Sequence, residues 1–327
     1  MQDIKWGIIG CGGIAHEFAT SLQALETGTL LAGASRTPGR AQEFAEKHGM
    51  ERVYTDYESL VADPDIDAVY IATTHNFHHE NIRLCLENGR HVLCEKPFTV
   101  NAAQTEELIR LAREKNLFMM EAVWTRFLPA IRKLQELLAE GIIGEVLTVK
   151  ADFSIYGDFG DEHRLKNKAL AGGALLDLGI YPVTFASIVF GEEPSLIQSS
   201  AVTGNTGVDD RSFYLFEYEG GRRAQLSSSF THHAPTEGIA CGTEGYIRVP
   251  HFLGAKQLQV HRAGEDTEFF DLPFNDGENF KFEIAHAMEC IEASKLESDI
   301  LPLSTTLAIM QTMDTLRSQW RLKYEGE

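Results

Sequence analysis

The chain has 327 residues, of which 43% are hydrophobic and 24% are charged, the ordinary balance of a folded globular protein. That length exceeds the roughly 250–300 residues at which one hydrophobic core stops growing, so two domains are expected. A formal net charge of −19 argues against a nucleic-acid partner, because phosphate binding needs clustered lysine and arginine.

The cysteines are scattered, with no close-spaced pair that would indicate a zinc site or a redox couple, and this favours reduced thiols. Met1 to Lys5 lead directly into a strand without a signal segment, and no run of about 18 apolar residues follows. The sequence therefore predicts a cytoplasmic protein with no membrane partner. The cysteines are Cys11, Cys85, Cys94, Cys241 and Cys290.

The first 120 residues alternate short apolar runs with helical patterns, which is typical of βαβ units around a parallel sheet. The predicted strands are Lys5–Ile9, Leu30–Ser35, Ala68–Ala72, His91–Cys94 and Leu117–Glu121. The predicted helices are Ile14–Leu25, Arg40–His48, Tyr57–Ala62, His79–Asn88 and Ala102–Lys115. Asn101 is a good N-cap for the last of these. Residues 1–125 are therefore assigned to an α/β domain.

From about Glu145 the pattern changes to period-two stretches separated by turn residues, as in antiparallel strands. The predicted strands are Leu147–Phe153, Ser212–Tyr218, Arg223–Phe230 and Gln257–His261, and the predicted helices are Gly173–Phe190, Phe282–Ser294 and Ser304–Trp320. A helix near residues 126–144 links the two patterns. Residues 126–327 are assigned to an α+β domain with an open, mostly antiparallel sheet, whose C-terminal helix is expected to pack back on the first domain.

A glycine-rich turn, Gly10-Cys11-Gly12-Gly13-Ile14-Ala15, follows the first strand and opens the first helix, the context that a dinucleotide-binding turn requires. Gly10 permits the tight turn, Gly12 lets the backbone approach a pyrophosphate, and Ala15 allows close helix packing. The helix N-terminus adds amide donors and a partial positive charge. The alternative is a turn without a ligand, and the motif names a cofactor class rather than a reaction.

Ser35-Arg36-Thr37 ends the second strand, where an NAD site usually places an acidic residue on the ribose hydroxyls. Two hydroxyls and a guanidinium suit a 2′-phosphate instead, because arginine offers a planar fork of donors. Arg40, one helical turn on, is a further candidate for this phosphate. We therefore predict NADP rather than NAD. The alternative is a solvated arginine that pairs with Glu43.

The loop Thr73-Thr74-His75-Asn76-Phe77-His78-His79 follows the third long strand, at the edge where open α/β sheets bind ligands. Thr73, Thr74, Asn76 and His78 are candidates to line the ribose and the nicotinamide. The alternative is that residues of this loop cap the helix that follows. No carboxylate or cysteine lies among the histidines, so no metal site is predicted.

Glu95-Lys96-Pro97 follows the next strand, and its proline can continue neither a strand ladder nor a helix. Lys96 is therefore expected to project into the same crevice. All three residues are candidate cofactor contacts, and Lys96 is also a candidate catalytic residue. The alternative is an exposed lysine that pairs with Glu95 and contributes little to stability.

The segment Gly172-Gly173-Ala174-Leu175-Leu176-Asp177-Leu178-Gly179-Ile180-Tyr181-Pro182 breaks its own local rules. In a helix, Asp177 and Tyr181 would lie at i and i+4 on one face. Gly179 and Pro182 both oppose a helix, the proline by about 3 kcal/mol in a helix interior. Such conflicts concentrate at functional sites. The alternative is a kinked core helix with a buried tyrosine, which leaves the carboxylate one turn earlier unexplained.

These motifs together resemble the glucose-fructose oxidoreductase/inositol dehydrogenase (GFO/IDH/MocA) family, over essentially the whole chain. The resemblance rests on Gly-x-Gly-x-x-Ala, Glu95-Lys96-Pro97 and Gly-Gly-Ala-Leu-Leu-Asp-x-Gly-x-Tyr. Glu121-Ala122-Val123-Trp124-Thr125-Arg126-Phe127 and Met310-Gln311-Thr312-Met313-Asp314 are similar to the dimeric dihydrodiol dehydrogenase and sugar dehydrogenase branch. The tyrosine at position 181 disfavours the inositol branch.

The resemblance implies a Rossmann domain followed by a domain whose open sheet commonly forms a dimer interface, so a homodimer or higher homo-oligomer is expected. It implies that Lys96 lies beside nicotinamide and substrate, and that Pro97 follows a cis bond. Asp177 and Tyr181 match the family's aspartate and its acid/base position. Tyr181 would exchange the hydroxyl proton during hydride transfer to or from a small sugar, polyol or cyclic diol, and Lys96 would favour the phenolate. Asp177 would bind substrate or orient Lys96.

Further candidates for the substrate side precede or flank the Asp177 segment, and each has an equally structural interpretation. They are Trp124, Arg126, Phe153, Arg164 and Asn167. Two other functions remain open: a non-catalytic NADP-binding sensor on the same fold, and an oxidoreductase that retains its cofactor tightly. The joint presence of Lys96, Asp177 and Tyr181 favours an enzyme, while the substrate and the direction of reaction are not readable from the sequence.

Overall fold

A computed structural model describes residues 3–191, 193–325 and 327; Met1 and Gln2, predicted to lead into the first strand, lie outside the described residues. The chain divides into two compact units. Unit 1 contains residues up to 124 together with 274–307, and unit 2 contains 125–273 and 308–327. The first division lies within one residue of the predicted boundary, while the segment 274–307 groups with unit 1. All five cysteines are free.

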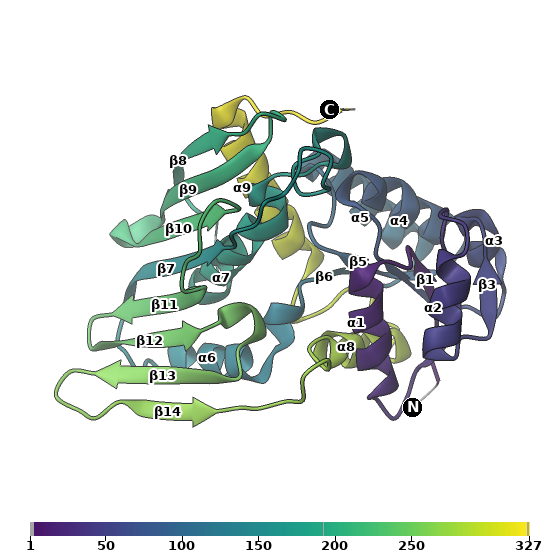
Figure 1. Ribbon diagram of the computed structural model, residues 1–327. Helices are drawn as coiled ribbons and strands as arrows, with labels where there is room; N and C mark the ends of the chain where they lie inside the picture. The colour runs from purple at the N-terminus through teal and green to yellow at the C-terminus, as the bar shows by residue number, and fades with distance from the viewer. Residues whose placement is uncertain (1–2, 192, 326) are drawn as a thin grey trace. The chain divides into compact units, whose positions relative to one another are not determined.

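Unit 1 is built on a parallel sheet, as predicted, whose six strands follow the order β3-β2-β1-β4-β5-β6 (Figure 1); five of the six were predicted individually. The strands are β1 Lys5–Ile9, β2 Thr29–Ala34, β3 Arg52–Tyr54, β4 Ala68–Ile71, β5 His91–Glu95 and β6 Met119–Ala122. The strand order reverses at β1, which lies between β2 and β4. The carboxyl ends of β1 and β4 therefore border the position where open α/β sheets bind ligands.

The helices of unit 1 cover both faces of its sheet. They are α1 Gly13–Gln23, α2 Arg40–His48, α3 Tyr57–Ala62, the 3₁₀ turn η1 His75–Phe77, α4 His78–Glu87, α5 Ala102–Lys115 and α8 Lys281–Glu292. Apolar side chains of α3, α4 and α5 pack with Val69 and Ile71 in one core. Tyr70 alternates to the other face, where its ring stacks on Phe18 of α1 at 3.9 Å.

The carboxyl group of Glu283, in α8, is fully buried, which is unusual for a glutamate. Among the described residues neither of its oxygens has a hydrogen-bond partner. Burial raises the pKa of Glu283 well above its ordinary value, and the nearby charges of Glu95 and Glu121 raise it further. A buried polar group without a partner costs free energy, so Glu283 is a destabilising feature when it ionises.

We expect Glu283→Gln to flatten the dependence of stability on pH. The folded chain holds this proton more tightly than the unfolded chain, whose glutamate pKa is about 4.5, so stability falls as the pH rises above that value. The glutamine variant should gain roughly 1–3 kcal/mol over the parent at alkaline pH and little at pH 4. Denaturant unfolding at pH 4, 6 and 9 measures this difference. The exposed Glu289→Gln on the same helix is the control, and equal curves for both variants would contradict the prediction.

Unit 2 contains an eight-stranded sheet in the order β14-β13-β12-β11-β7-β10-β9-β8, antiparallel except where β7 meets β10. The strands are β7 Val146–Ser154, β8 Leu196–Thr203, β9 Asp209–Glu217, β10 Arg223–Ser229, β11 Glu237–Gly242, β12 Gly245–Pro250, β13 Gln257–Arg262 and β14 Glu268–Asp271. The mostly antiparallel sheet confirms the prediction, although β8, β11, β12 and β14 were not predicted individually.

One face of this sheet is covered by helices and the other is open. The helical elements are η2 Trp124–Phe127, which begins at the last residue of unit 1, α6 Pro129–Ala139, η3 Lys168–Leu170, η4 Leu175–Gly179, α7 Ile180–Phe190, η5 Glu219–Gly221, η6 Phe252–Gly254 and α9 Leu303–Trp320, whose first residues belong to unit 1. The core helix α7 packs on β7, β10 and β11. On the opposite face Phe213, Tyr246 and Phe269 are 40–59% exposed.

The predicted helix Gly173–Phe190 is in fact two elements. Residues Leu175–Gly179 form a π-turn, in which the Ile180 N–H donates to the Leu175 carbonyl five residues back, and α7 continues from Ile180. By length and composition Lys168–Phe190 is apolar enough to cross a membrane, although no such run was predicted from the sequence, and 83% of its apolar window is buried inside the structure. Burial of this kind is typical of a core helix.

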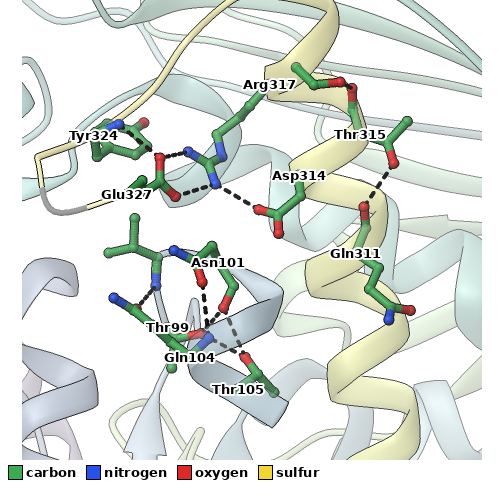
Figure 2. A network of polar contacts seen from close by, with 12 residues as sticks. Thr99, Asn101, Gln104, Thr105, Gln311, Asp314, Thr315, Arg317, Tyr324 and Glu327 are labelled. Atoms are coloured by element: carbon green, nitrogen blue, oxygen red, sulfur yellow. Dashed lines mark hydrogen bonds and ion pairs between the residues drawn. The ribbon is translucent and has the colours of Figure 1, made fainter. Parts of the chain in front are cut away.

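The end of the chain is fixed to the rest of unit 2 by a charged network (Figure 2). Arg317 of α9 donates to Asp314 at 2.6 Å and to both carboxylate oxygens of Glu327 at 2.7 and 2.8 Å. The Tyr324 N–H donates to Glu327, and the Tyr324 hydroxyl donates to the Gly172 carbonyl at 2.5 Å. In unit 1, Figure 2 also shows the predicted N-cap of α5, where the Asn101 side chain accepts from the Gln104 N–H.

Candidate active site

The glycine turn at the end of β1 has the conformation that a dinucleotide requires. Gly10 has a φ of +93°, and a Cβ at this position would lie 2.9 Å from the backbone of Ala72. Apart from the adjoining residues, no atom of the described chain lies within 4 Å of an ideal Cβ on Gly12 or Gly13, so the turn is open at the start of α1. Ala15, in the first turn of α1, is fully buried. The open backbone and the helix N-terminus fit a bound pyrophosphate.

Cys11 lies inside this turn but is not a nucleophile. Its thiol is 3% exposed and donates to the Ala34 carbonyl at 3.6 Å. Burial raises the pKa of the Cys11 thiol to about 12, although the positive charge of Arg40 opposes this shift. The thiol therefore stays protonated near neutral pH, and its function is to fill the space under the turn.

Arg36 is held in place by two aromatic rings at the end of β2. Its guanidinium carbon lies 4.3 Å from the ring centroid of Phe77 and 5.0 Å from that of Tyr57. The nearest carboxylate is Glu80, at 3.9 Å, and not Glu43 as in the alternative interpretation. The Arg36 side chain is 50% exposed, so stacking fixes its plane and leaves N–H donors at its edge accessible.

The remaining candidates at this strand end, Ser35, Thr37 and Arg40, lie close to Arg36 in the sequence. Ser35 is buried, and its hydroxyl accepts from the Thr37 N–H at 3.2 Å, which closes a tight turn. Thr37 and Arg40 are exposed, and Arg40 is the first residue of α2. The turn therefore presents one hydroxyl group and two guanidinium groups at the carboxyl end of β2. Residues 35–40 contain no aspartate or glutamate that could bind the ribose hydroxyls of NAD.

His78 differs from its predicted role. Its ring is fully buried, and its two nitrogens lie 2.8 Å from the Pro97 carbonyl and 3.1 Å from the Thr73 carbonyl. Each nitrogen faces a backbone carbonyl, which leaves neither accessible to a cofactor. Burial lowers the pKa of His78, and the neutral ring carries one N–H, which donates to one of these two carbonyls. We correct its assignment to a positioning residue that joins the loop after β4 to the turn after β5.

The rest of the loop after β4 remains open to a ligand. Thr73, Thr74 and Asn76 are partly exposed. The Thr74 hydroxyl donates to the Asn76 side-chain oxygen at 2.8 Å, and Asn81 donates to the Thr73 hydroxyl at 3.1 Å. These bonds fix the loop beside the glycine turn, in the place that the strand order predicts for the ribose.

The turn after β5 separates the side chains of Glu95 and Lys96. Glu95 is 5% exposed, and its carboxylate accepts from the Tyr70 hydroxyl at 2.5 Å. Lys96 is partly exposed, and the Lys96–Pro97 bond is cis, as the family resemblance implies. Glu95 therefore belongs to the core beneath the turn, while Lys96 stands at the carboxyl end of a strand adjacent to β4.

Unit 2 holds the other predicted catalytic residues in the π-turn and at the start of α7. Asp177 is 6% exposed and accepts from the Arg164 guanidinium, with an Nη1–Oδ1 distance of 2.9 Å. Tyr181 is also 6% exposed, and its ring meets that of Phe153 edge to face at a centroid distance of 5.7 Å. The structure thus joins Arg164 and Phe153, predicted as substrate-side candidates, to Asp177 and Tyr181.

Two of the other substrate-side candidates have contacts within their own units, and the third is buried. The indole of Trp124 lies 5.5 Å from the Phe280 ring in unit 1. Arg126 is 7% exposed in η2. Asn167 caps η3 by accepting from the Ala169 N–H at 3.0 Å, which is a structural role. In the part of the chain that the structure describes, no group of three or more His, Cys, Asp or Glu could hold a metal ion.

Three features of the site were missed by sequence reasoning. The first is the stacking of Arg36 on Tyr57 and Phe77, whose rings are too far from Arg36 in the sequence to give a local signal. Arg164 and Asp177 are separated by a turn whose path the sequence does not show. Asp209 of β9 lies under the π-turn and is 1% exposed. An aspartate within a strand was the one signal that the sequence offered for it.

Comparison with known proteins agrees with both halves of this description. Residues 4–122 match the model of an oxidoreductase family with an NAD-binding Rossmann fold, and residues 131–248 match the GFO/IDH/MocA C-terminal domain. The chain is 37% identical over 332 residues to trans-1,2-dihydrobenzene-1,2-diol dehydrogenase of Xenopus laevis, an alignment that covers 98% of this chain and 99% of the relative.

Solved structures share the fold over nearly the full length. A 3-ketoreductase from Actinomadura kijaniata, solved with NADP and TDP-benzene, is 28% identical with a TM-score of 0.85, covering 97% of this chain and 98% of that one. A levoglucosan dehydrogenase is 21% identical with a TM-score of 0.89, covering 97% of each chain, and it shows likeness of fold alone.

Proposed function

The chain belongs to the GFO/IDH/MocA oxidoreductase family, and we propose that it is an NADP-dependent dehydrogenase or reductase acting on a sugar, polyol or cyclic diol. Membership in this family establishes that the chain is an NAD(P)-binding oxidoreductase. Beyond that, we propose that it prefers NADP and that its substrate is a hydroxylated small molecule of this class. They are supported by a relative named for a dihydrodiol and by one named a ketoreductase and solved with NADP.

The observation that carries the proposal is the arrangement of polar groups at one edge of the unit 1 sheet. The open glycine turn follows β1, the Thr73–Asn76 loop follows the neighbouring β4, and Lys96 follows β5. Parallel strands bring these carboxyl ends to the same edge. This edge of the sheet thus offers a helix N-terminus for the phosphates, hydroxyl groups for the ribose and a positive charge. These are the groups that a nicotinamide-binding site needs.

We propose the following roles for the chain's own residues. The glycine turn and the Thr73–Asn76 loop would hold a nicotinamide dinucleotide, which would supply or take up a hydride. Tyr181 exchanges the proton of the substrate hydroxyl, and Lys96 supplies a positive charge that stabilises an oxyanion on the substrate. Phe153 packs on the Tyr181 ring and limits its rotation. Arg164 holds one oxygen of Asp177, which fixes the carboxylate for a hydrogen bond to a substrate hydroxyl.

The test of this function is a screen for turnover with the purified full chain. NADP reduction is followed by absorbance with aldoses, anhydrosugars, cyclic trans-diols and inositols, and NADPH oxidation with the matching ketones. Turnover with at least one hydroxylated class supports the proposal. Cofactor binding without turnover on any class would favour a sensor, and a stoichiometric nicotinamide absorbance after gel filtration would favour a tightly retained cofactor.

We expect Arg36→Ala to weaken NADPH binding without a matching loss for NADH. The stacked guanidinium is presented to a 2′-phosphate, and charged hydrogen bonds of this kind contribute roughly 1.5–3 kcal/mol, or about 10- to 150-fold in Kd. Fluorescence titration of both cofactors measures the ratio. Arg113→Ala removes the same charge from an exposed site on α5 and is the control. An equal loss for both cofactors, or a tighter parent Kd for NADH, would overturn the preference for NADP.

We also propose that the open face of the unit 2 sheet joins two copies of this chain. Strand register places Phe213, Tyr246 and Phe269 on the same face, where all three are exposed. Apolar rings among polar residues on a bare sheet mark an interaction surface. Light scattering after gel filtration should give twice the chain mass of 36.4 kDa, and Phe213→Glu should lower it toward the monomer. A monomeric parent chain would contradict the proposal.

A further inference from the structure

Four polar side chains of β9 and β10 form a buried cluster beneath the π-turn, which we call the β9–β10 polar cluster: Asp209, Ser212, Tyr214 and Ser228. Asp209 Oδ2 accepts from the Leu175 N–H at 2.8 Å and from the Ser212 hydroxyl at 3.0 Å. The Tyr214 hydroxyl lies 2.7 Å from the Ser212 hydroxyl and 2.6 Å from that of Ser228. All four residues are at most 3% exposed.

The cluster contacts the π-turn at both of its ends. A Cβ on Gly173, whose φ is +127°, would lie 2.5 Å from Asp209 Oδ1. A Cβ on Gly179 would lie 2.5 Å from the Tyr214 hydroxyl and 3.0 Å from that of Ser228. Both glycines are therefore required for the turn to rest on the cluster. This explains why the sequence has Gly179, which opposes a helix, at the end of the turn.

The bond to Leu175 has a specific structural value. The first N–H groups of a helix have no intrahelical partner, and a buried N–H without a partner is costly. Asp209 satisfies this donor from a neighbouring strand. It thereby fixes where the π-turn begins, and π-turns are rare and need such support. Asp177 is the third residue of the turn, and Tyr181 is the second residue after it.

We propose that Asp209 is a positioning residue, which anchors the start of the π-turn on the β9–β10 polar cluster and so sets the positions of Asp177 and Tyr181. This inference rests on the proposed catalytic roles of those two residues. Asp209 does not act on the substrate. It acts through the Leu175 N–H and through the close approach of Gly173.

The protonation of Asp209 is part of this role. Oδ1 has no hydrogen-bond partner among the described residues, whereas Oδ2 has two. Burial raises the pKa of Asp209 to about 7, and the charge of Asp210 adds to this. The titratable groups that face it are Asp210, which pairs with Lys166 at 3.5 Å, and the hydroxyls of Tyr214 and Tyr324. A proton on Oδ1 leaves both bonds of Oδ2 intact, so the neutral acid suffices as the anchor.

The experiment compares Asp209→Ala and Asp209→Asn with Asp210→Asn as the matched control. The readouts are amide hydrogen exchange of peptides covering 173–181, kcat and KM from pH 5.5 to 9, and NADPH affinity. Asp209→Ala should lose exchange protection and lower kcat by roughly 100-fold, the typical cost of a small misplacement, with NADPH affinity unchanged. Asp209→Asn copies the neutral acid, so it should keep protection and turnover and lose the inflection near pH 7.

The outcomes separate this inference from the proposed function. Unchanged exchange protection in Asp209→Ala would overturn the positioning role, whatever the activity. Lost protection with unchanged turnover would uphold the anchor and contradict the proposed roles of Asp177 and Tyr181. If Asp209→Ala does not fold, Gly179→Ala provides the second variant, because its methyl group pushes the turn from Tyr214 while Asp209 remains. Normal protection and kcat in Gly179→Ala would then overturn the inference.

Discussion

Tyr181→Phe is expected to lower kcat by roughly 10²–10⁴-fold, the usual contribution of general acid–base catalysis, and to leave NADPH affinity unchanged. The variant removes only the hydroxyl group, so the edge-to-face contact with Phe153 and the buried packing of the ring are retained. The loss should therefore appear in the chemical step and not in stability. Single-turnover kinetics and thermal unfolding of the same preparation measure the two quantities separately.

Lys96→Ala tests whether the two residues act together. If Lys96 stabilises the oxyanion that Tyr181 protonates, the double variant should lose little more than the more damaging single variant. Tyr246→Phe, which changes an exposed tyrosine of the same unit, is the control for the loss of a hydroxyl. Turnover near that of the parent in both single variants would exclude the proposed mechanism.

Gly10→Ala is expected to abolish measurable dinucleotide binding and to destabilise unit 1. The φ of +93° is unfavourable for alanine, and the added methyl group would meet the Ala72 backbone at 2.9 Å, where no side chain can move aside. Strained conformations of this kind cost roughly 1–3 kcal/mol, and the clash adds to that cost. Thermal unfolding and NADPH titration should therefore both change.

Gly12→Ala separates the two roles of the glycine turn. Nothing lies within 4 Å of its ideal Cβ, and its φ of −95° suits any residue, so the melting temperature should stay close to that of the parent. NADPH affinity should nevertheless fall by roughly tenfold or more, because the methyl group occupies the space where the backbone approaches the pyrophosphate. Unchanged affinity in Gly12→Ala would show that no dinucleotide binds over this turn.

Unit 1 was predictable because its buried strands and amphipathic helices carry strong local patterns. β1, α2, α3 and α5 were predicted to the residue. β3 was missed because three residues are too few for a period. In unit 2, β11 and β12 are short, β11 ends at a glycine, and β12 begins at a glycine and ends at a proline. Glycine and proline at these positions are typical of turns, so the two strands were not predicted. Their pairing with distant strands, and not local propensity, makes them strands.

The candidate site was predictable where topology alone gathers residues. Parallel strands bring Gly10, Thr73 and Lys96 to one edge whatever their side chains do. The role of His78 was not predictable, because only the fold shows that both ring nitrogens meet backbone carbonyls. The same holds for Asp209, whose function depends on a contact between a strand and a turn far apart in the chain.

The π-turn also has a consequence for insertions and deletions. Each residue of an α-helix advances the helix by about 100°, and a π-turn accommodates one residue more than an α-helical turn. Deleting one residue between Gly173 and Gly179 would let the segment close as a regular helix while α7 keeps its rotation, so the Tyr181–Phe153 and Phe185–Phe252 ring contacts would be retained. The residues inside the turn would shift instead, and Asp177 would move relative to Arg164. The extra residue therefore sets the position of Asp177 separately from the packing of α7.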